Sequence, residues 1–122
     1  MPLKGSCHCG LTQFEVNEAP ADVTRCTCSF CSKHGVLWAY YKPDQFVLLT
    51  PEQNSATYQW RTQTVEHHHC ANCGCSTFTV SPDFSTGKPD FEHPKVGVNA
   101  RLFDDFDLDA VPVQVIDGRN LW

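Results

Sequence analysis

The sequence has few basic residues, no long apolar run and no helical periodicity. Its 9 Lys and Arg residues are scattered singly among 14 Asp and Glu residues, which gives a formal charge of −5. A nucleic-acid-binding surface needs clustered basic side chains to neutralise phosphates, so this pattern argues against a nucleic-acid partner. The run at residues 36–41 is among the longest apolar ones, and a membrane-spanning helix needs about 20 such residues. We therefore expect no nucleic-acid partner and no membrane partner.

The first ten residues, MPLKGSCHCG, contain no apolar core of the kind that a signal peptide requires. We therefore expect a cytoplasmic, reducing location. In such a compartment disulfides are rare, and clustered cysteines more often serve metals or catalysis. With 8 cysteines in 122 residues, the cysteine content becomes the main clue to the chemistry of this chain.

The apolar pattern favours strands over helices. No window of about eleven residues carries a 3.6-residue stripe, whereas short β-branched and aromatic runs alternate with turns rich in Pro, Gly, Asn and Asp. The expected strands are residues 11–16, 36–41, 46–49, 56–60, 77–80, 96–100 and 113–116. Short helical turns are expected near residues 20–23, 51–53 and 108–111. The sequence thus predicts one all-β domain over residues 1–122, with roughly seven to nine short strands.

Two cysteine pairs that lie far apart in the sequence form the first candidate site. Cys7 and Cys9 make a C-x-C pair, Cys70 and Cys73 make a C-x-x-C pair, and a glycine follows each pair. Glycine tolerates the positive φ that a tight metal-binding turn often needs. Two such pairs suit a closed four-cysteine zinc site that joins two hairpins, so we predict a structural zinc here. Disulfide pairing and free core thiols are the alternatives.

The stretch TRCTCSFCS forms the second candidate site, with Cys26, Cys28 and Cys31 inside six residues. Three protein ligands and one exchangeable position are typical of a catalytic zinc. Three thiolates donate strongly and make zinc a weaker Lewis acid than three histidines would. Binding and deprotonating an incoming thiol is then favoured over activating water. Such a thiolate beside an aldehyde carbon is suited to making or breaking a C–S bond.

Other side chains could close this second site. Cys75 could move into it and complete a second four-cysteine site, and His34 or a histidine of the run at 67–69 could complete a site of three cysteines and one histidine. If residues 67–69 form a strand leading into Cys70, His67 and His69 share one face. Spacing alone supports open and closed sites equally. Two closed sites would indicate a non-enzymatic, zinc-stabilised adaptor that binds another protein.

Four segments follow one another along essentially the whole chain: GSCHCG, RCTCSFCSKHG, HHHCANCG and VNARLFDDFDLDAVPVQVIDGRNLW. Together they resemble the glutathione-dependent formaldehyde-activating enzyme family, also called the centromere-protein-V-like family. The resemblance implies a zinc-stapled all-β domain of the β-tent type with two Zn²⁺ ions per chain. It places the structural zinc on Cys7, Cys9, Cys70 and Cys73 and the catalytic zinc on Cys26, Cys28 and Cys31.

The activity that this resemblance implies is that of a carbon–sulfur lyase. Glutathione and formaldehyde would form S-hydroxymethylglutathione, and the reverse reaction would cleave it. Named members of the family are longer than this chain, and none of their glutathione-binding residues maps onto a position here. Arginine forks fit carboxylates bidentately, so the candidates for the glutathione carboxylates are Arg25, Arg61, Arg101 and Arg119.

Overall fold

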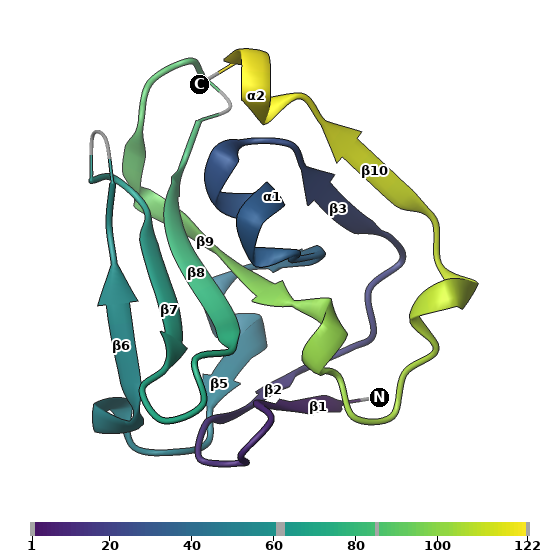
Figure 1. The fold of residues 1–122 in the computed structure, drawn as a ribbon. Helices are drawn as coiled ribbons and strands as arrows, with labels where there is room; N and C mark the ends of the chain where they lie inside the picture. Colours follow the sequence, from purple (N-terminus) through teal and green to yellow (C-terminus); the bar gives the residue numbers. More distant parts are fainter. Residues whose placement is uncertain (1, 61–62, 85, 122) are drawn as a thin grey trace.

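Two β-sheets make up most of the computed structural model, which describes residues 2–60, 63–84 and 86–121 (Figure 1). The smaller, antiparallel sheet has the order β1-β2-β5 and contains Leu3–Ser6, Gln13–Val16 and Phe46–Leu48. The larger sheet has the order β10-β3-β4-β9-β8-β7-β6. In chain order its strands are β3 Val23–Cys26, β4 Trp38–Tyr41, β6 Ser55–Tyr58, β7 Glu66–Cys70, β8 Ser76–Asp83, β9 Asp90–Asn99 and β10 Val113–Ile116.

The helices are short. The described residues contain two α-helices, α1 (Ser29–His34) and α2 (Gly118–Leu121). They also contain four single turns of 3₁₀-helix, at Pro43–Gln45, Glu52–Asn54, Ala100–Leu102 and Leu108–Ala110. None of the described helices combines the length and the hydropathy needed to span a lipid bilayer. The pairing of β10 with β3 is parallel, and it brings the C-terminal segment alongside the strand that ends at Cys26.

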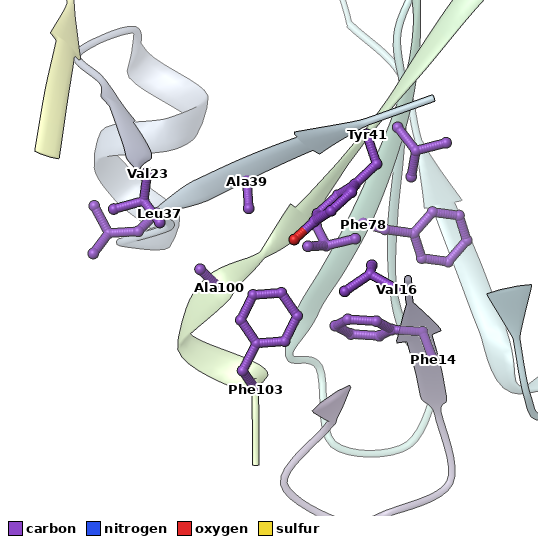
Figure 2. Packing of buried hydrophobic residues seen from close by; sticks show 11 residues of the cluster. Phe14, Val16, Val23, Leu37, Ala39, Tyr41, Phe78, Ala100 and Phe103 are labelled. Atoms are coloured by element: carbon purple, nitrogen blue, oxygen red, sulfur yellow. The ribbon is translucent and has the colours of Figure 1, made fainter. Parts of the chain in front are cut away.

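The hydrophobic core lies between the small sheet and one face of the large sheet (Figure 2). Phe14 of β2 packs between Phe46 and Phe103, with ring centroids 5.9 Å away in both cases. Phe46 in turn packs on Phe78 of β8 at 4.9 Å. Ala39 of β4 also belongs to this core. Because side chains alternate along a strand, the preceding Trp38 points to the opposite face of the large sheet. Its indole bonds Cys31 of α1, so α1 covers that opposite face.

The prediction of an all-β fold is confirmed, and the strand expected at residues 113–116 is β10. The described residues contain ten strands, more than the seven to nine expected. The list of expected strands missed β1, β3 and β7, and a strand leading into Cys70 was considered only as a condition. The strands β8 and β9 are longer than predicted. The helical turn expected at residues 20–23 was wrong because Val23 begins β3. The other two turns are confirmed as 3₁₀-helices.

We predict that Phe14→Ala lowers the free energy of unfolding of the metal-loaded protein by about 3–5 kcal/mol. The Phe14 side chain is fully buried, and alanine would leave a cavity between the two sheets. Urea denaturation at a fixed metal concentration measures the change. Phe91, which is 63% exposed, supplies the control, and Phe91→Ala should change stability by less than about 0.5 kcal/mol. Equal effects of the two variants would contradict this description of the core.

Candidate functional site

The two distant cysteine pairs come together where the β1–β2 connection meets the β7–β8 turn. The sulfur atoms of Cys7, Cys9, Cys70 and Cys73 all lie within 4.8 Å of one another. The Cys9 sulfur is 3.6 Å from those of Cys7 and Cys70. A zinc ion about 2.3 Å from each of four sulfurs would hold them about 3.8 Å apart. The four sulfurs, named cluster 1 below, are therefore spaced as the ligands of one tetrahedral ion.

The backbone of cluster 1 repeats the same turn twice. Gly10 and Gly74, which follow the two pairs, both have φ of +82°, a conformation that glycine adopts without strain. Each also donates its N–H to the carbonyl of the first cysteine of its pair, Cys7 at 3.1 Å and Cys70 at 3.0 Å. The two cysteine–glycine turns therefore have the same geometry. A hydrogen bond from the backbone N–H of Cys75 lowers the pKa of Cys73 to about 6, which favours the thiolate that a metal requires.

The second set of sulfurs, named cluster 2, lies at the junction of β3 and α1. Cys26 is the last residue of β3, Cys28 is the N-cap of α1, and Cys31 lies in its first turn. Their sulfur atoms lie within 4.8 Å of one another, and all three residues are buried. The N-cap bond runs from the Cys31 N–H to the Cys28 sulfur at 3.4 Å. The helix ends at Gly35, whose φ of 65° and N–H bond to the Cys31 carbonyl form its C-cap.

Each sulfur of cluster 2 accepts at least one N–H hydrogen bond. The donors are the backbone of Cys28 to Cys26 at 3.5 Å, the backbone of Cys31 to Cys28, and the indole Nε1 of Trp38 to Cys31 at 3.3 Å. These bonds orient the three sulfurs and stabilise negative charge on them. The sequence did not identify Trp38 as a neighbour of the cluster. A tryptophan in the next strand, whose N–H needs a partner once buried, was the available signal.

The ionisation of the three thiols in cluster 2 suits the binding of a cation between their sulfurs. Burial raises the pKa of Cys26 and of Cys31. Burial also opposes ionisation of Cys28, but hydrogen bonds from Cys31 and its neighbours outweigh it and lower the Cys28 pKa. Three thiolates this close together in a buried site require a compensating positive charge. Both clusters can therefore hold a metal ion, and thiolate donors suit zinc.

No fourth ligand for cluster 2 comes from the part of the chain that the structure describes: no other Cys, His, Asp or Glu side chain joins its three sulfurs. Cys75 lies beside cluster 1, where its sulfur receives the His8 backbone N–H and contacts Cys73. His34 instead stacks on Phe30 and bonds the Phe30 carbonyl oxygen. Neither Cys75 nor His34, both considered from the sequence, therefore supplies a fourth ligand to cluster 2.

A cavity of about 420 Å³ lies between α1 and the β6–β8 part of the large sheet. It is lined by Phe30, His34, Tyr58, His67, His69, Gly74 and Ser76. The Phe30 ring stacks on His34 at 4.0 Å and on His67 at 3.8 Å. Two rings at such distances must take opposite faces of Phe30, so the phenyl ring is sandwiched between the imidazoles. Phe30 packs in one buried group with Cys26, Cys28 and Cys31, so the lining of this cavity contacts cluster 2 through its ring. A second cavity, of about 320 Å³, is lined by Trp38, Tyr40 and the loop at 18–22.

Two of the four candidate arginines lie next to the helices near cluster 2. The Nε of Arg101 donates to the carbonyl oxygen of Gly35, at the end of α1, at 2.7 Å. The backbone N–H of Arg119 donates to the hydroxyl of Thr27 at 3.2 Å, and its side chain is exposed. Arg25 is exposed on β3. Arg61 lies outside the described residues.

Comparison with known proteins agrees with the resemblance seen in the sequence. The family model for the glutathione-dependent formaldehyde-activating enzyme matches residues 2–113. A Halomonas elongata protein, provisionally named a glutathione-dependent formaldehyde-activating enzyme, is 31% identical over 103 residues. The match covers 77% of this chain but 63% of that relative, so this chain spans less than two thirds of its length. A crystal structure of a Rhodobacter sphaeroides protein, a Northeast Structural Genomics target, has a TM-score of 0.73 at 29% identity and covers 92% of this chain and all of its own.

We predict that stability falls with pH below neutrality in part because of His67. Burial, together with His34 and His68 nearby, lowers the pKa of His67 from 6.5 to about 4. Between those two values the unfolded chain binds a proton at this residue and the folded chain does not, so acidification favours unfolding. In His67→Gln, the free energy of unfolding should therefore fall less steeply from pH 6.5 to about 4.5.

Urea denaturation of metal-loaded protein across this pH range measures the slope. His8 is exposed, and His8→Gln serves as the matched control that should follow the wild-type slope. Parallel pH dependences for His67→Gln and the wild type would show that His67 contributes nothing to acid sensitivity.

Proposed function

We propose, since this chain belongs to the glutathione-dependent formaldehyde-activating enzyme family, that it is a zinc-dependent enzyme that joins a small thiol to an aldehyde or cleaves their adduct. Family membership and the name of the Halomonas relative support glutathione and formaldehyde as the reactants. The observation that carries the proposal is cluster 2, where three buried sulfurs converge and no described side chain offers a fourth ligand. The catalytic domain would comprise residues 1–122.

The two clusters would have different roles. Cys7, Cys9, Cys70 and Cys73 would hold a structural zinc, with all four positions filled by the chain. Cys26, Cys28 and Cys31 would hold a catalytic zinc, which when bound would deprotonate a thiol that takes its fourth position. All eight cysteines are free, so those of both clusters are available as thiolate ligands. We keep the cytoplasmic location expected from the sequence as part of the proposal.

The cavity beside α1 is our candidate for the binding site of the thiol. Its volume of about 420 Å³ is within the usual range for small-molecule sites, roughly 300–1,000 Å³. Phe30 presents an apolar surface to this cavity directly beside cluster 2. We prefer it to the cavity at Trp38 because its lining includes imidazoles that can exchange protons. Arg101 and Arg119 remain candidates for the carboxylates of glutathione.

His34 is our candidate for the acceptor of the thiol proton. Its Nδ1 lies 2.9 Å from the Phe30 carbonyl oxygen, which can only accept, so Nδ1 carries the hydrogen and Nε2 of the neutral ring is the acceptor. In the forward reaction the thiol sulfur forms a bond with the aldehyde carbon. The proton passes from the thiol to His34 and then to the aldehyde oxygen, which becomes a hydroxyl. The reverse reaction returns the same proton and breaks the C–S bond.

The alternative of a non-enzymatic adaptor requires the chain to close both metal sites. Cys75 was one of the candidates for closing cluster 2, and its sulfur lies beside Cys73 of cluster 1 instead. No observation in the described residues favours the adaptor. The enzyme is therefore the function that we propose.

Substitution of one cysteine in each cluster tests the division of roles. Cys28→Ser should retain one metal and a cooperative thermal transition, and it should bind the second metal more than about 100-fold more weakly, because losing even an indirect partner of a metal ligand costs about 10–100-fold. Cys70→Ser should instead unfold the chain, since a structural zinc contributes about 10–16 kcal/mol of folding free energy. Metal analysis and circular dichroism measure both effects. Identical behaviour of the two variants would refute separate roles.

The activity itself can be followed by NMR with carbon-13 formaldehyde and glutathione. The wild-type protein should accelerate formation of S-hydroxymethylglutathione above the uncatalysed rate, and Cys28→Ser should return the rate to that background. His8→Gln provides a control at an exposed position away from cluster 2. A wild-type protein that binds two metals and leaves the uncatalysed rate unchanged would contradict the proposed reaction.

A further inference from the structure

The C-terminal turn of the chain packs against the loop that carries Cys26 and Cys28. The parallel pairing of β10 with β3 ends where Ile116 lies opposite Cys26. Thr27, between the two cysteines, donates its backbone N–H to the Ile116 carbonyl at 3.0 Å, and its hydroxyl accepts the Arg119 N–H at 3.2 Å. In Figure 1 the yellow α2 lies next to the dark blue segment between β3 and α1. A segment far along the chain therefore forms one side of cluster 2.

Gly118 makes the closest approach of this turn to the sulfurs. A Cβ atom at position 118 would lie 2.5 Å from the Cys26 sulfur, 2.9 Å from Cβ of Cys28 and 3.0 Å from its backbone nitrogen. One of these Cys28 atoms is the backbone nitrogen and the other is the Cβ attached to the backbone. Neither can move unless the backbone of Cys28 moves too. The Cys26 sulfur could rotate away, but it would then leave the cluster. The backbone of residue 118 therefore fits against cluster 2 only without a side chain.

The conformation of residue 118 does not itself require glycine. Its φ lies outside the positive region that Gly10, Gly35, Gly74 and Gly87 occupy. Residue 118 belongs to a short helix, where alanine has a higher intrinsic propensity than glycine. Local preference would thus favour a side chain at this position. The contact with the two cysteines is what excludes one.

Hydrogen bonds within the turn hold it in place. The Asp117 carboxylate accepts bonds from Nδ2 of Asn120 at 2.9 and 3.2 Å. The Thr27 hydroxyl lies 3.4 Å from the same carboxylate. The turn is thus tied both to itself and to the loop between Cys26 and Cys28. A displaced Gly118 would have to break these bonds as well.

We propose that Gly118 is a positioning residue, and that the turn at residues 116–120 forms a wall that keeps the Cys26 sulfur directed into cluster 2. The proposal rests on the proposed function, because it assigns to this turn the geometry of the candidate catalytic metal site. Gly118 touches the ligand residues and not the reactants, so its effect on chemistry would be indirect.

Competition of the zinc-loaded protein with a chromophoric chelator, which measures the affinity of each bound ion while the chain stays folded, tests the proposal. The wild-type chain should bind two ions. Gly118→Ala should bind the first with unchanged affinity and the second about 10–100-fold more weakly, as for other groups that position metal ligands. The matched control is Gly87→Ala, where φ is +84° and a Cβ would meet nothing within 4 Å. This control adds a methyl group that displaces no neighbouring atom, and it should bind two ions as the wild type does.

Thr27→Val is a second variant, which removes the hydroxyl that receives the Arg119 N–H and adds no atom near Cys26. It should also weaken only the second ion. Two ions bound at wild-type affinity by both variants would overturn the role of the wall while leaving the proposed function intact. Loss of both ions in Gly118→Ala would also overturn it, because the effect would then be on folding as a whole. A wild-type chain that binds one ion would instead refute the proposed function.

Discussion

The convergence of four sulfur atoms from two distant segments is the constraint on which the rest of this structure depends. Cluster 1 joins the connection after β1, in the small sheet, to the end of β7, in the large sheet. A chain of 122 residues buries a modest core, and a metal that binds only the folded chain adds its binding energy to that core. Because β7 ends at Cys70, cluster 1 also fixes the strand that carries His67 and His69.

This dependence extends from cluster 1 to cluster 2. His67 on β7 stacks on Phe30, and Phe30 belongs to the helix that presents Cys28 and Cys31. The cavity lies between β7, which ends in cluster 1, and α1, which carries Cys31 of cluster 2. Each cluster thus helps to position one side of the cavity. Cluster 1 gathers four sulfurs from segments far apart, an arrangement that would suit a permanent cross-link by a metal. Cluster 2 gathers three sulfurs from one short loop, and its long-range neighbours, Trp38 and Gly118, approach these cysteines without adding a fourth donor.

The sequence was most informative where the chemistry is local. Both cysteine groups could be recognised from spacing, because ligands within a few residues of one another must share a turn, and the structure assembles each group as predicted. The helix α1 was missed because its six residues, capped by a sulfur, are too short to show helical periodicity. The position of Cys75, the indole bond of Trp38 and the contact of Gly118 depend on tertiary structure. No local pattern could specify them.

The most direct test of a closed cluster 1 and an open cluster 2 is cadmium-113 NMR of the metal-exchanged protein, recorded before and after addition of glutathione. The cadmium shift reports the number of sulfur ligands at each site. We predict one four-sulfur signal that glutathione leaves unchanged and a second signal that moves when the thiol is added. Two four-sulfur signals that both ignore glutathione would mean that the chain fills every metal position itself, and they would contradict an enzyme that takes its fourth ligand from the substrate.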